Sequence, residues 1–244
     1  MLNLLKKIGK KLATRKLTIS FCYERISWRM KSMKEYSYRL MPSIRTRIKL
    51  IDNANKQNRM LELGPGGERI KGFETVDITP GRVVDYVADA ASKLPFPDNV
   101  FKVVYASHVL EHIPWYQTTD ALKEWIRILA PGGRLEVCVP DGLKICKTIV
   151  EYEELGVDNT TLDGWYRFNE ERDPCKWVSG RLFTYGDGKG TIGHWNWHRA
   201  MFTPRYMIKL FENEGLTNVR LMHSSEVRGY NHGWINLGVL GVKK

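Results

Sequence analysis

Short apolar runs separated by glycine and polar turn residues dominate residues 59–142. Runs of this kind are typical of parallel strands that are covered on both faces. A helix capped by Thr118 or Thr119 is expected to run through Leu129 and to stop at Pro131-Gly132-Gly133. The pattern predicts an α/β domain with five successive strands at Met60–Leu63, Phe73–Ile78, Val83–Ala88, Val100–Ala106 and Arg134–Val139.

Helical patterns return after residue 142, on either side of a long irregular segment. Leu143–Leu155 predicts one helix, and Thr203-Pro204 begins another that runs to Glu214. Residues 156–200 have no clear period but are rich in glycine and aromatic residues. A segment of this length inside a domain is usually functional or disordered, and its aromatic content argues against disorder.

Residues 1–58 have a helical and strongly basic pattern. Apolar residues recur at helical spacing among lysines in residues 1–16, aromatic and basic residues alternate from Ile19 to Ile51, and Pro42 is an expected break between helices. Residues 1–59 contain 16 Lys and Arg against three acidic residues, whereas residues 60–244 contain 22 against 24. A domain that tracked RNA phosphates would carry basic residues around its own cleft, so nucleic acid is the less favoured partner.

Two interpretations of each part of this arm stay open. Residues 1–16 either dock on an anionic membrane surface or form a solvated helix packed on the domain. The segment from Ile19 to Ile51 either covers a cleft or stacks on nucleic-acid bases. No apolar run approaches the roughly 20 residues that span a bilayer. We therefore expect a cytoplasmic protein, soluble or held peripherally on the inner face of the membrane, with reduced thiols at its four cysteines.

A glycine-rich loop, Gly64-Pro65-Gly66-Gly67, follows the first predicted strand. Glycines at the carboxyl end of a parallel strand let backbone amides approach a ligand, and residues 68–70 are expected to begin a short helix. The loop lacks the Gly-Lys-Ser/Thr of a triphosphate site, and Arg69 stands where the dinucleotide fingerprint has Gly or Ala. Glu62 would repel a pyrophosphate but suits a cofactor with an ammonium and a sulfonium group, which favours S-adenosyl-L-methionine.

Five sequence blocks together resemble the class I S-adenosylmethionine-dependent methyltransferases, and among them the small type-11-like enzymes associated with polysaccharide assembly. The blocks are the glycine loop, Thr75-Val76-Asp77, Ala88-Asp89-Ala90 with Leu94-Pro95-Phe96, Ser107-His108-Val109-Leu110-Glu111-His112, and Leu129-Ala130-Pro131-Gly132-Gly133-Arg134-Leu135.

This resemblance implies a Rossmann-like α/β fold for residues 59–244, with a mostly parallel seven-stranded sheet and an antiparallel last strand. Leu216–Met222 and Gly233–Val242 would be its closing strands. Residues 156–200 would be a substrate-binding insertion, and residues 1–58 a basic amphipathic helical arm or lid.

The resemblance also implies the contacts with S-adenosyl-L-methionine. Asp77 would accept hydrogen bonds from both ribose hydroxyls. Asp89 would bind the adenine amino group, and the alternative for Asp89 is a turn or N-cap residue. The full predicted cofactor set is Glu62, Gly64, Pro65, Gly66, Asp77, Ile78, Asp89, Ala90, Ser107 and His108.

Candidate catalytic residues follow the fourth and fifth predicted strands. His108 and His112 share one face of a helical turn, with Glu111 between them. A zinc site would need a third ligand at a recognisable spacing. No such ligand is evident in the sequence, so we predict no metal. His112 or His198 is the expected general base, with Asp141 orienting the base or the acceptor. The alternative for His112 is a histidine that only braces its loop. His198 matches a histidine that similar enzymes place three residues before a Met-Phe pair.

The expected acceptor is a sugar hydroxyl in a glycan or lipid-linked polysaccharide. Aromatic rings beside polar side chains suit the C–H faces and hydroxyls of a sugar. The predicted substrate contacts are Tyr185, His194, Trp195, Trp197 and Arg199. Two other functions stay open, an RNA methyltransferase and a non-catalytic methyltransferase-like scaffold.

Overall fold

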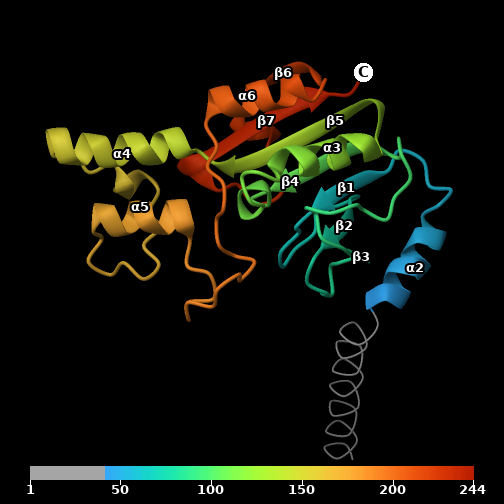
Figure 1. Cartoon of the computed structure of the whole chain (residues 1–244), viewed down its shortest axis with the longest axis horizontal. Helices are drawn as coiled ribbons and strands as arrows, with labels where there is room; N and C mark the ends of the chain where they lie inside the picture. The colour runs from blue at the N-terminus through green and yellow to red at the C-terminus, as the bar shows by residue number, and fades with distance from the viewer. Residues whose placement is uncertain (1–41) are drawn as a thin grey trace, which may run out of the picture.

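The computed structural model of the protein describes residues 42–244, which form a seven-stranded sheet with helices packed around it (Figure 1). The predicted basic helix of residues 1–16, and the aromatic and basic segment as far as residue 41, lie outside the described residues. The strands are β1 (Met60–Leu63), β2 (Glu74–Asp77), β3 (Tyr86–Val87), β4 (Phe101–Ser107), β5 (Leu129–Pro140), β6 (Thr217–Leu221) and β7 (Asn236–Val242). The α-helices are α2 (Pro42–Asp52), α3 (Thr118–Ile128), α4 (Gly142–Leu155), α5 (Pro174–Phe183) and α6 (Pro204–Asn213). Four 3-10 turns accompany them in this part of the chain, η1 (Leu110–His112), η2 (Thr160–Leu162), η3 (Ser224–Glu226) and η4 (Gly233–Ile235).

The strands are arranged in the order β3-β2-β1-β4-β5-β7-β6. Neighbouring strands from β3 to β5 are parallel, whereas β7 runs antiparallel to both β5 and β6. The predicted mostly parallel sheet with an antiparallel last strand is confirmed. The strand order reverses direction between β1 and β4, and the carboxyl ends of strands at such a switch point are where open α/β sheets bind ligands.

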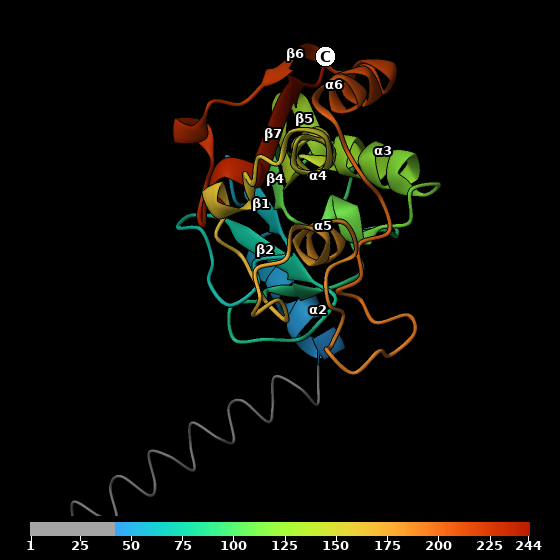
Figure 2. The ribbon, with the colours of Figure 1, turned by 90° about the vertical axis from the view of Figure 1, so that its left-hand side faces the viewer.

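The two faces of the sheet are covered differently in residues 42–244. Val104 and Ala106 of β4 belong to the core that includes α3 and α6, which lie on the same side of the sheet (Figure 2). Because side chains alternate along a strand, Val103 and Tyr105 face the opposite side. There they pack against a loop segment between β6 and β7 that includes Val227, rather than against a crossover helix.

The chain passes from β1 to β2 without a helix, which corrects the predicted helix start at residues 68–70. Side chains hold this segment as a loop instead. The Ile70 N–H donates to the Glu62 carboxylate at 2.9 Å, and the Arg69 guanidinium lies 2.6 Å from the Asp85 carboxylate. These bonds replace the backbone bonds that a helix would make.

β3 is shorter than the predicted strand at Val83–Ala88. The Thr75 hydroxyl donates to the Val83 carbonyl oxygen at 2.6 Å and accepts from the Asp85 N–H at 2.9 Å. A side chain of β2 therefore binds the backbone that would have extended β3.

α3 begins and ends differently from the prediction. Its N-cap is Gln117, and neither predicted threonine caps it. Thr118 is buried, and its hydroxyl donates to the Trp115 carbonyl oxygen at 2.9 Å. The helix ends at Ile128, and β5 begins at the next residue.

The predicted helix stop at residues 131–133 consequently lies within β5. Gly133 is required there because the backbone comes close to its neighbours. A Cβ at this position would lie 2.7 Å from the Ala130 carbonyl oxygen and 3.0 Å from that of Phe101. Gly133 thus serves a close backbone approach, Gly132 has φ +74°, and neither residue terminates a helix.

α6 and α5 begin with the same chemistry, although only α6 was predicted. The Thr203 side chain accepts from the Tyr206 N–H, and proline is the first residue of α6. Asp173 accepts from the Lys176 N–H at 2.8 Å, and Pro174 is the first residue of α5. α5 interrupts the predicted irregular segment and packs against α4 through a cluster that contains Trp177.

α2 lies within the predicted arm and packs on β3. The Thr46 hydroxyl accepts from the Val87 N–H at 3.0 Å, and the Asn53 amide donates to the Tyr86 hydroxyl at 2.7 Å. Pro42 is the first residue of α2, and the helix that it was predicted to separate from α2 lies outside the described residues. None of the helices in residues 42–244 has the length and apolar content that crossing a bilayer requires.

Candidate active site

The glycine loop turns sharply where β1 ends. The Gly64 N–H donates to the Val76 carbonyl oxygen at 2.8 Å, and φ is +66° at Gly64 and +58° at Gly66. A Cβ on Gly64 would lie 2.5 Å from Cγ2 of Val109, just beyond the end of β4. Glycine is needed at this position for both its backbone angle and the close contact. The carbonyl oxygen of Pro65 accepts from the Glu68 N–H within the turn.

Glu62 of β1 is buried behind this loop, where its carboxylate accepts the Ile70 N–H. Burial raises the pKa of Glu62, while the Ile70 N–H and Arg69 act to lower it. The carboxylate therefore stabilises the loop through its hydrogen bond with the Ile70 N–H. Its contact with a cofactor ammonium group stays a prediction.

Asp77 ends β2 with one carboxylate oxygen available. Its Oδ1 accepts from the Thr79 N–H at 2.7 Å, and no residue in 42–244 donates a hydrogen bond to Oδ2. Burial raises the pKa of Asp77, and the Thr79 N–H lowers it. Ile78, the next residue, is half exposed. A free carboxylate oxygen beside an exposed apolar side chain fits a ribose and its attached base.

Asp89 and Ala90 form a turn just after β3. Oδ1 of Asp89 accepts from the Ala91 N–H at 2.9 Å, and Oδ2 accepts from the Ser92 hydroxyl at 3.3 Å. The Ala90 carbonyl oxygen accepts from Nε1 of Trp125 at 2.9 Å, which anchors the turn to α3. The structure thus gives Asp89 the turn role that was the alternative interpretation, and its adenine contact stays a prediction.

The end of β4 combines backbone strain with an unpartnered polar group. His108 has φ +54°, a conformation that is uncommon outside glycine and concentrates at functional sites. Its N–H donates to the Cys138 carbonyl oxygen at 2.9 Å. The Ser107 hydroxyl is buried and has no hydrogen-bond partner among the described residues. Such a hydroxyl at the switch point fits a polar group of a bound cofactor.

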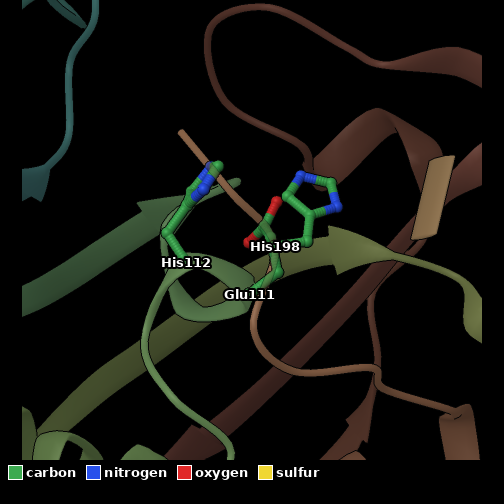
Figure 3. A group of neighbouring side chains, drawn as sticks. All are labelled: Glu111, His112 and His198. Atoms are coloured by element: carbon green, nitrogen blue, oxygen red, sulfur yellow. The ribbon is translucent and has the colours of Figure 1, made fainter. Parts of the chain in front are cut away.

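Three side chains that can bind a proton or a metal ion meet just past this point (Figure 3). Glu111 and His112 come from η1, and His198 comes from the distant segment that follows α5. One ring nitrogen or carboxylate oxygen from each residue lies within 4.8 Å of those of the other two. The rings of His112 and His198 meet edge to face with their centroids 4.9 Å apart. The fold therefore brings His198 next to Glu111 and His112, although no sequence spacing had indicated a third possible ligand.

Backbone hydrogen bonds join the end of the insertion to η1. The Glu111 carbonyl oxygen accepts from the Arg199 N–H at 2.7 Å. Nδ1 of His112 lies 3.3 Å from the Trp197 carbonyl oxygen, and Nδ1 of His198 lies 3.1 Å from that of Arg181. A carbonyl oxygen only accepts, so Nδ1 carries a proton in each ring, and in the neutral form of the ring Nε2 keeps a lone pair.

The electrostatics of this group favour a carboxylate beside a neutral imidazole. Burial alone would raise the pKa of Glu111, but His108, His112 and His198 together bring it well below its usual range. Burial lowers the pKa of His198 to about 4, although the Glu111 charge acts in the opposite direction. At neutral pH Glu111 is thus ionised and His198 is uncharged.

Glu111 and His232 are site residues that sequence reasoning missed. Oε1 of Glu111 lies 3.0 Å from Nδ1 of His108, and the ring of His232 stacks on His108 with centroids 3.6 Å apart. Burial lowers the pKa of His232 to about 4, and His108 adds to that effect. The signal for Glu111 was its position between two histidines. His232 had no such signal, because its contact joins distant parts of the chain.

Asp141 has a capping role in the structure. It is buried, and its Oδ1 accepts from the Leu143 N–H at 3.0 Å and the Lys144 N–H at 3.2 Å at the start of α4. No hydrogen bond joins it to Glu111, His112 or His198 within the described residues. Its predicted role in orienting a base stays a prediction without a contact to support it.

Most of the predicted substrate residues make contacts within the protein. Nε1 of Trp197 donates to the Thr191 carbonyl oxygen at 3.0 Å, and Arg199 donates to the carbonyl oxygen of His194. Nδ1 of His194 accepts from the Asn196 N–H at 3.2 Å. These bonds hold the loop before α6 in shape.

The other two predicted substrate residues are aromatic. The guanidinium of Arg167 lies 3.7 Å from the ring centroid of Tyr185, which it covers. Trp195 is 56% exposed, and the centroid of its ring lies 5.0 Å from that of the His194 ring. The substrate roles of all five residues stay predictions.

Comparison with known proteins finds similarity for the part of the chain that runs from β1 into β5. Residues 61–137 match a family model described as a methyltransferase domain. The chain is 36% identical over 80 residues to a demethylmenaquinone methyltransferase of Anoxybacillus flavithermus, a match that covers 33% of this chain and 29% of that protein. It is 46% identical over 54 residues to the ubiquinone/menaquinone biosynthesis C-methyltransferase UbiE of Ectopseudomonas mendocina, which covers 22% of this chain and 20% of that protein. The chain therefore spans less than a third of the length of these curated relatives.

Solved structures show a weaker likeness over more of the chain. A methyltransferase from Thermotoga maritima, described as a possible histamine N-methyltransferase, aligns with a TM-score of 0.40 at 18% identity, over 92% of this chain and 97% of that one. A methyltransferase from Archaeoglobus fulgidus aligns with a TM-score of 0.44 at 14% identity, over 87% and 99%. The match of residues 61–137 includes the glycine loop, Asp77, Asp89 and the end of β4, so this part of the chain is similar to a methyltransferase domain. That similarity implies S-adenosyl-L-methionine as the cofactor.

Proposed function

We propose that the protein transfers a methyl group from S-adenosyl-L-methionine to a hydroxyl of a sugar, in a glycan or lipid-linked polysaccharide. The observation that carries this proposal is the position of Glu111, His112 and His198. Glu111 and His112 follow the end of β4, where the cofactor sulfonium is expected, and the fold brings His198 beside them. Side chains of these types are chemically able to activate a hydroxyl.

The bound cofactor would supply an electrophilic methyl group on a cationic sulfur. The chain would hold it through the glycine loop, Asp77 and the turn after β3. Aligning the acceptor oxygen with the methyl carbon can contribute roughly 7–11 kcal/mol in favourable cases. His112 or His198 would accept the hydroxyl proton at Nε2, because Nδ1 of each ring faces a backbone carbonyl oxygen.

Exposed aromatic rings close to this group support a sugar acceptor. Trp115 and Tyr116, just after η1, are 69% and 65% exposed, and their rings meet edge to face at 5.6 Å. The Trp115 N–H donates to the Arg199 carbonyl oxygen at 3.2 Å, so this pair adjoins the segment that carries His198. The exposed Trp195 lies on the same segment. Such rings stack on the C–H faces of sugars, while polar neighbours bind the hydroxyls.

The acceptor is tested by offering the protein several classes of substrate. Purified full-length protein is incubated with methyl-labelled cofactor and with surface glycans, RNA or quinone precursors from a host that lacks the gene. We expect label in the glycan fraction and a mass increase of one CH₂ group on a sugar. Label in RNA or in a quinone precursor, with none in glycan, would replace the proposed acceptor.

A scaffold is distinguished by cofactor binding. Calorimetric titration with S-adenosylhomocysteine should show one site for each chain. Trp195→Ala should lower transfer to the glycan without changing that affinity. A protein that neither binds the cofactor product nor transfers label would be the non-catalytic scaffold.

For residues 1–16, which lie outside the described residues, we propose docking on an anionic membrane surface. The support is their sequence, in which Leu2, Leu5, Ile8 and Leu12 recur at helical spacing among lysines. Each basic residue near such a surface contributes about 1 kcal/mol. Co-sedimentation with phosphatidylserine vesicles should pellet the full chain and leave a variant without residues 1–16 in solution. Equal pelleting of both forms would reject the proposal.

A further inference from the structure

Glu111 is a buried carboxylate that lacks a well-formed hydrogen bond. Its side chain is 1% exposed, and neither oxygen has a hydrogen-bond partner of acceptable geometry in residues 42–244. Oε1 lies 3.0 Å from Nδ1 of His108, which leaves Oε2 without any close partner among those residues. A buried charge of this kind is costly unless a positive group compensates it.

The two imidazoles beside it are held as metal-binding histidines usually are. In metal sites the second ring nitrogen donates to a carbonyl oxygen or a carboxylate, which fixes the ring and its tautomer. Here Nδ1 of His112 faces the Trp197 carbonyl oxygen, and Nδ1 of His198 faces that of Arg181. The ligating atom left on each ring is Nε2.

We propose that Glu111, His112 and His198 form a binding site for a divalent first-row transition-metal ion such as Zn²⁺, with a coordination position left for an acceptor oxygen. Two histidines and one carboxylate are a known ligand set for catalytic zinc and for non-haem iron. Ligand atoms around a tetrahedral zinc ion lie about 3.4 Å apart. The present limit of 4.8 Å therefore requires a modest closing of the three side chains.

The proposed ion would change the role of the histidines. With both Nε2 lone pairs on the ion, the imidazoles act as ligands, and coordination lowers the pKa of a bound hydroxyl so that its proton passes to water. His108 would then orient the carboxylate from its other side, since Nδ1 of His108 is next to Oε1 and Nε2 lies 3.2 Å from Oδ1 of Asn236. Ion binding itself does not depend on the acceptor or on methyl transfer.

The test measures the ion directly on untagged full-length protein that has been stripped with a chelator. Zn²⁺ is titrated by calorimetry, and Co²⁺ is followed by its visible absorption. We expect one equivalent of ion for each chain and a higher unfolding temperature with Zn²⁺ present. Glu111→Gln, His112→Gln and His198→Gln should each weaken binding by about tenfold or more.

His223→Gln is the matched control, because His223 is exposed and contacts Ser225, far from this group in the chain. It should bind the ion as the wild-type protein does. Absence of bound Zn²⁺ and Co²⁺ in the wild-type protein would overturn the site even if a variant failed to fold, and so would unchanged binding in His198→Gln. Titration of the same stripped protein with S-adenosylhomocysteine separates the two proposals, because a chain without an ion site still binds the cofactor product if the proposed function holds.

Discussion

Gly64 and Val109 are in direct contact across the switch point of the sheet, because a Cβ on Gly64 would stand 2.5 Å from Cγ2 of Val109. Gly64 also has φ +66°, which costs other residues about 1–2 kcal/mol. We predict that Gly64→Ala displaces the glycine loop and lowers the affinity for S-adenosylhomocysteine at least about tenfold. Calorimetric titration measures this change.

Two variants separate displacement of the loop from general strain. Gly215→Ala imposes a similar backbone strain at φ +81°, but nothing lies within 4 Å of its added Cβ, so affinity should be retained. Gly64→Ala with Val109→Ala removes the clashing methyl group and should recover part of the affinity. Equal affinity in Gly64→Ala and wild-type protein would show that the loop does not hold the cofactor.

Asp77→Asn tests the predicted ribose contact. A carboxylate can accept two hydroxyl donors at once, whereas an amide presents one oxygen and one donor. Hydrogen bonds to a charged group contribute about 1.5–3 kcal/mol, so affinity for S-adenosylhomocysteine should fall roughly 10- to 100-fold. Asp120→Asn, on the exposed surface of α3, is the control and should bind normally. If both variants bind alike, Asp77 is not a cofactor residue.

Arg59 and Glu74 form a buried ion pair that fixes the start of the sheet. Nε and one terminal nitrogen of Arg59 lie 2.9 and 2.8 Å from the two carboxylate oxygens, and both side chains are at most 7% exposed. Arg59→Met leaves the Glu74 charge buried, which costs about 3–5 kcal/mol. Differential scanning calorimetry should show the unfolding temperature falling by roughly 6–20 °C.

A surface pair gives the matched comparison for Arg59. Lys176→Met breaks the exposed pair with Glu171 and should leave the unfolding temperature unchanged, because exposed ion pairs contribute little. Arg59→Met combined with Glu74→Met removes both charges and should recover part of the loss. A drop no larger than that of Lys176→Met would mean that the buried pair is not important for stability.

Cys138 should be chemically inert in the folded protein. It is fully buried on β5, and burial raises the pKa of its thiol to about 11. At pH 8 only about one thiol in a thousand would be the reactive thiolate. Iodoacetamide at this pH should label the exposed Cys175 in native protein and Cys138 only after unfolding, as read by peptide mass mapping. Native labelling of Cys138 at the rate of Cys175 would contradict this.

The strands and the cofactor loop could be predicted because their signals are local. Met60–Leu63 is a strand in the structure, as the sequence pattern predicts. A short apolar run that ends at glycines is typical of a buried strand. The helix end predicted at Gly132-Gly133 is wrong, because glycine occurs both at helix ends and where two backbone segments come close together. Only the contact with Phe101 decides between them.

The group of Glu111, His112 and His198 depends on contacts that no local sequence pattern contains. His198 reaches His112 because backbone bonds join Arg199 and Ala200 to η1, and the His198 N–H donates to the Phe183 carbonyl oxygen at the end of α5. α5 itself has a local signal, the Asp173-Pro174 pair at its start. Sequence reasoning therefore identified the residue types of the site but not which of them meet.

The segment between β6 and β7 is joined to the sheet by an ion pair and by a hydrogen bond. Nε of Arg228 lies 2.6 Å from the buried Glu136 carboxylate, and the Arg228 carbonyl oxygen accepts from the Tyr105 hydroxyl at 2.7 Å. Arg228→Gln should open this segment more often and speed chymotrypsin cleavage at the exposed Tyr230 by about tenfold.

Arg220→Gln is the control for this segment, because it breaks an exposed pair with Glu226 on the same stretch of chain and leaves the Arg228 pair intact. The Arg220 variant should be cleaved at the wild-type rate, and equal acceleration in both variants would mean that Arg228 has no special part. Since His232 stacks on His108 from the same segment, opening it also removes that ring from the site. Arg228→Gln should therefore lower methyl transfer even though Arg228 touches none of Glu111, His112 and His198.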